Sequence, residues 1–117
     1  MAKSNITLYH NPRCSKSRSA LSILEENGTR PAVIEYLKTP PTKAELKAIL
    51  GKLGMKPEQL VRKGEEIYKR KYAGKALTDQ QWIDALAEDP ILIERPILVA
   101  GERAVIGRPP EKVLEIL

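Results

Sequence analysis

The stretch from Tyr9 to Arg18 constrains the fold and the chemistry of this chain more than any other. It contains Cys14 and His10, the only cysteine and the only histidine of the 117 residues. Alternating residues before it predict a strand over Ile6–Tyr9, and apolar residues at helical spacing after it predict a helix that begins near Ser15. The cysteine is therefore expected at the N-terminus of a helix, where free backbone N–H groups and the helix dipole stabilise an anion.

Further strand signals occur near both ends of the chain. The first helix leads to alternating residues at 32–36, which predict a second strand parallel to the first and joined to it by the helical crossover. Near the C-terminus, residues 97–100 and 103–106 flank a short turn and predict an antiparallel hairpin. A last helix is expected over Glu111–Leu117, after a pair of prolines.

The segment between these strand regions is predicted to be helical. Capping-box patterns at Thr42 and Thr78 each mark the start of a helix. The element order is then βαβ, several helices at about residues 42–90, and ββα. This order is that of a thioredoxin-like α/β fold, with a mixed four-stranded sheet, flanking helices and a helical insertion. Because no linker or repeat divides the chain, we expect one domain over residues 1–117.

Composition and charge narrow the class of protein. Hydrophobic residues make up 42% of the chain, which favours a folded globular protein over a disordered one. A single cysteine excludes a disulfide within the chain, and no stretch resembles a signal peptide or a membrane span, so the cytoplasm is the expected location. The net charge of +5 is spread in short runs, which fits a solvated face or a small anionic substrate better than nucleic acid.

Cys14 is the strongest candidate for chemistry. Its neighbours Arg13, Ser15 and Lys16 are polar or cationic, which is a poor setting for a buried structural cysteine. A nearby cation and a helix N-terminus both lower the pKa of a thiol, so a functional cysteine is favoured. Ser17 lies three residues after Cys14, at the position where a Cys-x-x-Cys redox pair has its second cysteine. Any oxidised or covalent state of Cys14 must therefore be resolved by an outside thiol.

The histidine and three arginines are further candidates. His10 either orients the loop or assists the thiol, and a supporting structural role is favoured over acid–base catalysis. One cysteine and one histidine are too few ligands for a metal site. Arg62 is expected between helical segments, Arg95 precedes a proline that starts a strand, and Arg108 follows the hairpin. Guanidinium groups bind tetrahedral oxyanions through two donors, although the spacing alone also fits solvated surface arginines.

Separated motifs carry a resemblance to a known family. Residues 10–18, HNPRCSKSR, resemble the HNP-x-C-x-x-SR signature of the glutaredoxin-dependent arsenate reductase family (ArsC), to which the Spx-type regulators are related. Residues 91–97 are similar to its ILI-x-RPI segment, residues 60–63 to its helical-region arginine, and residues 107–111 to its last strand-to-helix turn. The similarity covers essentially the whole chain and is greatest to the short chromosomal members.

The resemblance implies a reaction and a site. Cys14 is expected to be the catalytic residue that attacks arsenate, and Arg62, Arg95 and Arg108 are expected to bind this oxyanion. The positions implied to support them are His10, Asn11, Ser15 and Ser17. The family's reaction implies no metal or bound cofactor, glutathione as co-substrate and glutaredoxin as the partner that supplies reducing equivalents for arsenic detoxification. Pro96 is expected to follow a cis peptide bond and to face the cysteine.

Two departures from the family pattern leave other functions open. The resistance-operon enzymes have Gly-Thr after the cysteine and continue beyond the last helix, whereas this chain has Ser15-Lys16 and ends at Leu117. One alternative is a glutathione-dependent thiol oxidoreductase with another substrate. A second is an Spx-like regulator that binds RNA polymerase, which is less favoured because its redox switch uses a cysteine pair and Ser17 replaces the second cysteine here.

Overall fold

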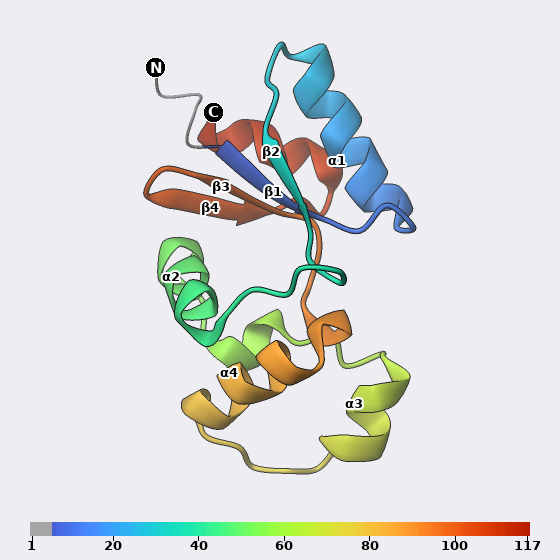
Figure 1. Ribbon diagram of the computed structural model, residues 1–117, viewed down its shortest axis with the longest axis vertical. Helices are drawn as coiled ribbons and strands as arrows, with labels where there is room; N and C mark the ends of the chain where they lie inside the picture. The colour runs from blue at the N-terminus through green and yellow to red at the C-terminus, as the bar shows by residue number, and fades with distance from the viewer. Residues whose placement is uncertain (1–5) are drawn as a thin grey trace. The chain divides into compact units, whose positions relative to one another are not determined.

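Two compact units make up the chain in the computed structural model, which describes residues 6–117 (Figure 1). The sheet unit runs to Thr39 and resumes from Arg95 to Leu117, and the helical unit is Pro40–Glu94. No helix within residues 6–117 is long and apolar enough to cross a membrane.

The sheet unit is built on four strands in the order β2–β1–β3–β4. Strand β1 (Ile6–His10) pairs in parallel with β2 (Ala32–Glu35) and antiparallel with β3 (Ile97–Ala100). Strand β3 in turn pairs antiparallel with β4 (Arg103–Ile106). The predicted mixed sheet, with its parallel pair and its C-terminal hairpin, is confirmed.

The register of the strands brings distant segments to one end of the sheet. Tyr9 near the end of β1 pairs with Ile97 at the start of β3, and Ile97 pairs with Ile106 at the end of β4. The residues that follow β1, precede β3 and follow β4 therefore leave the sheet at the same end. This end is where the loop that carries Cys14 begins.

The core of the sheet unit lies between one face of the sheet and two helices, α1 (Ser15–Glu26) and η4 (Pro110–Ile116). Both helices lie against this face in Figure 1, and they contact each other. Strand residues two apart point to the same side, and helix residues four apart share a face, so each element contributes apolar side chains to one layer. The buried side chains of this cluster are Ile6, Leu8, Ala20, Leu24, Leu98 and Val113.

The C-terminal segment differs from the prediction. An α-helix was expected over Glu111–Leu117, but Pro110–Ile116 forms a 3-10 helix, η4. Its bonds span three residues, as in the N–H of Lys112 that donates to the carbonyl of Pro109 at 3.0 Å. A segment this short gains little from the longer α-helical bonds, and burial of Val113 fixes it instead.

The helical unit contains three α-helices and two short 3-10 turns. The α-helices are α2 (Lys43–Leu53), α3 (Glu66–Lys71) and α4 (Asp79–Glu88), and the turns are η2 (Pro57–Leu60) and η3 (Pro90–Leu92). Helix α4 contacts α2 and both turns, and its side chains Trp82, Ile83 and Leu86 are buried. The central element of this unit is therefore the amphipathic helix α4.

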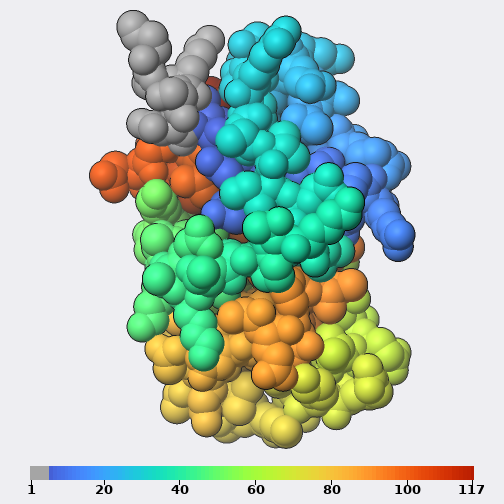
Figure 2. Space-filling view, viewed as in Figure 1, coloured from blue at the N-terminus to red at the C-terminus, as the bar shows by residue number. Residues whose placement is uncertain are grey.

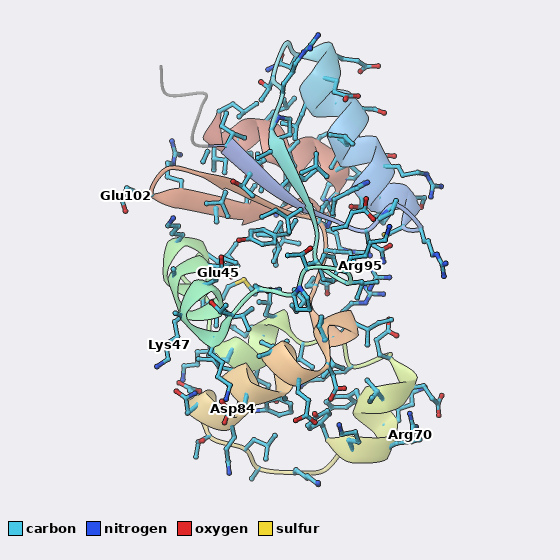
Figure 3. The ribbon with its side chains drawn as sticks, viewed as in Figure 1. Glu45, Lys47, Arg70, Asp84, Arg95 and Glu102 are labelled. Atoms are coloured by element: carbon cyan, nitrogen blue, oxygen red, sulfur yellow. The ribbon has the colours of Figure 1, made fainter. Side chains whose placement is uncertain are left out.

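Both predicted capping boxes begin their helices. Thr42 Oγ1 accepts a hydrogen bond from the N–H of Glu45 (3.1 Å), and Glu45, labelled in Figure 3, accepts one from the N–H of Thr42 (2.8 Å). Thr78 and Gln81 make the same pair of bonds at the start of α4. Helix α2 ends at Gly54, whose φ of +68° is left-handed and carries no steric cost for glycine.

Candidate functional site

Cys14 is the N-cap residue of α1, which confirms its predicted place at a helix N-terminus. Its backbone is extended (φ −95°, ψ 123°), and its carbonyl accepts the first helical bond from the N–H of Arg18 at 3.0 Å. The turn before it is closed by the N–H of Cys14, which donates to the carbonyl of Asn11 at 3.0 Å. The thiol is partly exposed, so it is open to a small reactant.

The surroundings of the thiol favour its ionised form. Partial burial acts to raise the pKa of Cys14, but hydrogen bonds from the N–H of Ser17, the Arg95 side chain and the N–H of Lys16 outweigh burial. The pKa of Cys14 therefore lies below its ordinary value. Because the thiolate is the nucleophilic form, this arrangement prepares the residue for attack on an electrophile.

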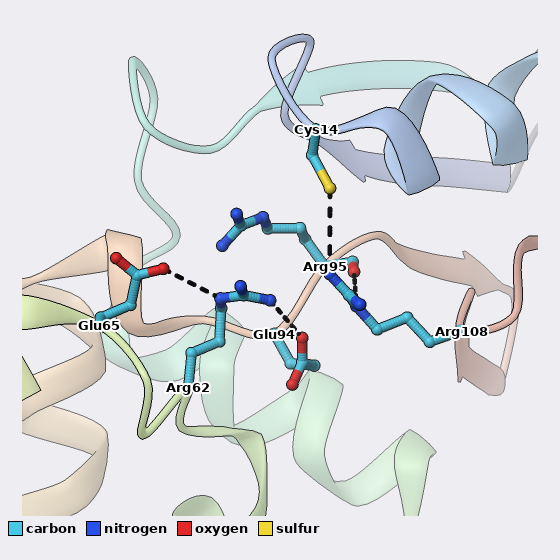
Figure 4. A network of polar contacts seen from close by, with 6 residues as sticks. All are labelled: Cys14, Arg62, Glu65, Glu94, Arg95 and Arg108. Carbon is cyan, nitrogen blue, oxygen red and sulfur yellow. Dashed lines mark hydrogen bonds and ion pairs between the residues drawn. The ribbon is translucent and has the colours of Figure 1, made fainter.

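Two of the three predicted arginines lie at this thiol (Figure 4). Arg108 Nη2 lies 4.0 Å from Cys14 Sγ, and Arg108 Nε donates to the carbonyl oxygen of Arg95 at 2.9 Å. The Arg95 side chain hydrogen-bonds the thiol itself. Two guanidinium groups therefore meet beside a sulfur that gains negative charge, and the same donors suit the oxygens of a tetrahedral anion.

Pro96 and Gly107 fix the spacing between the two segments that carry these arginines. The N–H of Gly107 donates to the carbonyl of Pro96 at 2.8 Å. A Cβ atom at Gly107 would lie 2.9 Å from Pro96 Cγ and 3.1 Å from Val113 Cγ1, so a larger residue requires one of these groups to move. The peptide bond before Pro96 is cis, as predicted, and so is the bond before Pro109. Gly107 was not identified as a site residue from the sequence.

His10, Asn11 and Ser17 form a buried support beneath the loop. Ser17 Oγ accepts a hydrogen bond from the N–H of Asn11 at 3.0 Å and lies 2.7 Å from His10 Nδ1. A hydroxyl can donate one hydrogen bond and accept two, so the contact between Ser17 Oγ and Nδ1 holds the ring in place with the imidazole proton on either nitrogen. Burial has the largest effect on the pKa of His10 and lowers it, in keeping with a neutral ring.

The remaining loop contacts complete this picture. Asn11 Oδ1 accepts a hydrogen bond from the N–H of Arg13 at 3.0 Å, and Arg18 Nη1 donates to the carbonyl of Pro12 at 3.0 Å. Ser15 is exposed in the first turn of α1, and within the described residues its side chain makes no hydrogen bond. The structure thus brings three of the four predicted supporting residues together, and Ser15 is the exception.

Arg62 belongs to the helical unit, where two carboxylates hold it. Its Nη1 donates to Glu94 Oε1 at 2.8 Å and its Nε donates to Glu65 Oε2 at 3.2 Å (Figure 4). Neither glutamate was predicted as a partner. The signal that could have found Glu94 is its place directly before Arg95 in the ILIERPI segment, within a motif that already contained a site candidate.

No group of three or more His, Cys, Asp or Glu side chains within residues 6–117 is arranged to hold a metal ion.

Comparison with known proteins places the chain in a family. Residues 9–116 match the model of the ArsC family. The uncharacterized protein YfgD of Escherichia coli K12 is 48% identical over 96% of both chains. The arsenate reductase of the same strain is 44% identical, covering 97% of this chain and 82% of that one. A solved structure of the arsenate reductase from Vibrio cholerae has a TM-score of 0.92 and 48% identity, covering 96% of this chain and 97% of that one. The family model spans nearly the whole chain, and the matched structure shares its fold, so this protein belongs to the ArsC family.

Proposed function

We propose that this protein is an arsenate reductase, with Cys14 as the nucleophile and Arg62, Arg95 and Arg108 as arsenate ligands. The observation that carries the proposal is the meeting of two guanidinium groups at a thiol whose pKa is lowered. Thiolate and arsenate are both anions and repel each other in the absence of cations. The site supplies the positive charge at the place where the two must meet.

The reaction begins with attack of the Cys14 thiolate on As(V). A sulfur–arsenic bond forms and an arsenic–oxygen bond breaks, and the departing oxygen leaves as water after protonation. The arsenic is then reduced to As(III) by two electrons. These come from two outside thiols, which join in one disulfide, so that arsenite leaves and the Cys14 thiol is restored. Arg95 and Arg108 stabilise the charge on the arsenate oxygens during the first step.

The outside thiols are required by the composition of the chain, because Cys14 is its only cysteine. We assign these roles to glutathione, which attacks the arsenylated cysteine, and to glutaredoxin, which completes the reduction. A lone thiol that works with such reductants fits the cytoplasm, a reducing compartment. In this proposal residues 1–117 act as one functional domain.

The decisive experiment is a coupled assay of arsenite formation with glutathione and glutaredoxin. Wild-type protein is expected to form arsenite, and the Cys14→Ser variant is expected to form none above background. Equal rates for the two proteins would reject the proposal. Reduction of glutathione mixed disulfides by a wild-type protein that forms no arsenite would favour the thiol oxidoreductase alternative instead.

The state of the thiol is tested separately by alkylation. The rate of iodoacetamide reaction with Cys14 is measured against pH, and its midpoint is expected below the value of about 8.5 for an ordinary cysteine. A midpoint at or above that value would contradict an activated nucleophile. Because Cys14 is the only thiol, the measurement needs no other cysteine to be removed.

A further inference from the structure

Two carboxylates of the helical unit hold the side chain of Arg62. Its Nη1 donates to Glu94 Oε1 at 2.8 Å and its Nε donates to Glu65 Oε2 at 3.2 Å, as the dashed lines of Figure 4 show. The three side chains are between 23% and 26% exposed, so water screens these ion pairs less than it screens pairs at the surface. An arginine bonded at two of its nitrogens has lost much of its rotamer freedom before a ligand arrives.

The backbone fixes Glu94 in its place beside Arg62. The N–H of Arg62 donates to the carbonyl of Leu92 at 2.7 Å, and the N–H of Glu94 donates to the carbonyl of Leu60 at 2.9 Å. Between these two bonds the chain forms an antiparallel bridge, and both leucines are fully buried. The carboxylate of Glu94 and the arginine that it bonds are therefore built onto one hydrogen-bonded piece of backbone.

Glu65 also comes from an anchored element. It is the N-cap residue of α3, and Lys71 in the last turn of that helix donates to Asp89 Oδ2 at 2.9 Å. The hydroxyl of Tyr72, directly after α3, donates to the same oxygen. In Figure 2 the yellow-green atoms of α3 lie beside the orange atoms of the segment that follows α4. Both partners of Arg62 are thus held by bonds of their own elements.

The bonds to the carboxylates leave one nitrogen of the guanidinium group available. An arginine carries five N–H donors, one on Nε and two on each Nη. Within residues 6–117 the Nη2 atom of Arg62 makes no hydrogen bond. The two carboxylates also offset the positive charge of Arg62, so directed hydrogen bonds are its main contribution to binding an anion. Nη2 is therefore the atom of this side chain that suits an oxyanion oxygen.

We propose that Glu94 and Glu65 are positioning residues, which hold Arg62 so that its Nη2 donates to an oxygen of the arsenate. The inference rests on the proposed function, in which Arg62 is an arsenate ligand. Glu94 directly precedes Arg95, so one residue connects the arginine of the helical unit to the segment that carries a second arsenate ligand. Because Arg62 is ordered in advance, binding of the oxyanion does not incur the cost of ordering it.

Steady-state kinetics with arsenate test the positioning role. Glu94→Ala should lower kcat/KM about five- to tenfold, the usual cost of ordering one long side chain on binding. Glu94→Gln keeps an acceptor oxygen and should recover most of this loss. In an Arg62→Ala background, Glu94→Ala should cause no further loss, because it acts through the arginine. The matched control is Glu58→Ala, which removes an exposed ion pair with Lys63 and should leave kcat/KM unchanged.

The order of the Arg62 side chain is measured without substrate. The heteronuclear NOE at Nε of Arg62 should be high in the wild-type protein and lower in Glu94→Ala and Glu65→Ala. The indole signal of the buried Trp82, the only tryptophan, shows whether the helical unit of each variant is folded. If Glu94→Ala does not fold, Glu65→Ala takes its place in both measurements, with the same expected direction.

The outcomes separate the two proposals. Full activity of Glu94→Ala, an equal loss with and without Arg62, or a high NOE in both alanine variants would overturn the positioning role. Arsenite formation by the wild-type protein together with any of these results would leave the proposed function in place. If the NOE falls in both variants while the wild-type protein makes no arsenite, the hold of the carboxylates on Arg62 stands and the proposed function fails.

Discussion

Lys71 in the helical unit and the two arginines at Cys14 in the sheet unit use positive charge in opposite ways. In the helical unit, Lys71 Nζ lies 2.9 Å from Asp89 Oδ2 and 3.0 Å from Glu88 Oε2. Hydrogen bonding to Asp89 raises the pKa of Lys71. Tyr72 also donates to Asp89. Each charge in this cluster is matched by an opposite charge or a hydrogen-bond donor.

In the sheet unit the cations meet a group that is neutral until it ionises. Arg95 and Arg108 bond to the Cys14 thiol, and one of the bonds of Arg108 goes to a neutral backbone carbonyl. The positive charge therefore stabilises the Cys14 thiolate and, in the proposed function, attracts the arsenate anion. Lys71 is thus matched by carboxylates and supports structure, whereas Arg95 and Arg108 face a titratable thiol and support chemistry.

The largest effect on activity is expected when one of the guanidinium groups at the thiol is removed. Arg95→Gln should lower kcat/KM for arsenate by about 10²- to 10³-fold, the usual loss on removing one donor to an oxyanion. It should also raise the pKa of Cys14, since the Arg95 side chain is one of the groups that lower it. Steady-state kinetics and pH-dependent alkylation measure the two effects.

The matched control is Arg103→Gln, which removes an exposed arginine of β4 in the same unit. It should change neither kcat/KM nor the alkylation midpoint. If both variants lose activity equally, net charge rather than contact with the thiol explains the effect.

The buried support under the loop predicts the next effect. Ser17→Ala leaves the N–H of Asn11 and His10 Nδ1 without their bonds in a buried place, which should cost about 2–3 kcal/mol of unfolding free energy. Urea unfolding followed by circular dichroism measures this. Ser19→Ala, at an exposed position of the same helix, should cost far less. A loss below about 0.5 kcal/mol for Ser17→Ala would show that the loop does not need this hydroxyl.

Substituting alanine for a glycine in each unit tests how tightly the backbone is packed at that glycine. Gly107→Ala places a methyl group against Pro96 and Val113 and should cost about 1–3 kcal/mol. Gly51→Ala lies in the helix α2, where a Cβ atom meets nothing within 4 Å, and should add up to about 1 kcal/mol of stability. Urea midpoints of the two variants should therefore move in opposite directions. Shifts of the same sign would contradict the tight fit at Gly107.

The smallest effect is a pH dependence in the helical unit. Burial acts to raise the pKa of Asp89, but bonds from Tyr72 and Lys71 outweigh it, so the pKa lies below the usual value. A carboxyl with a lowered pKa adds stability above about pH 4, and this stability is lost as the pH falls through the folded-state value. The gap in urea midpoint between wild type and Asp89→Asn should shrink from pH 7 to pH 3. A constant gap would exclude ionisation of Asp89 as its cause.

Much of the fold could be predicted because its signals are local. The strand, turn and helix around Cys14, the boxes at Thr42 and Thr78, and the left-handed Gly54 depend on residues a few positions apart. The helix type of the C-terminal segment was wrong because seven residues gain too little from either hydrogen-bond pattern for the sequence to decide.

The site could be predicted in part. Residue type and place in the chain singled out Cys14, Arg95 and Arg108, but their meeting depends on the register of β1, β3 and β4, which the sequence does not state. The bond between His10 and Ser17 and the pairing of Arg62 with Glu94 depend on side-chain geometry across folded segments. Such contacts leave no periodic pattern to detect.

The serine at position 17 has a kinetic consequence for the proposed reaction. A second cysteine at this position would react with Cys14 at an effective concentration that does not depend on the concentration of free thiols. With Ser17 buried beneath the loop and Cys14 the only thiol, the resolving step is bimolecular. Turnover then rises with the amount of free reductant until the co-substrate saturates its binding, so the rate of this protein follows the thiol supply of the cell.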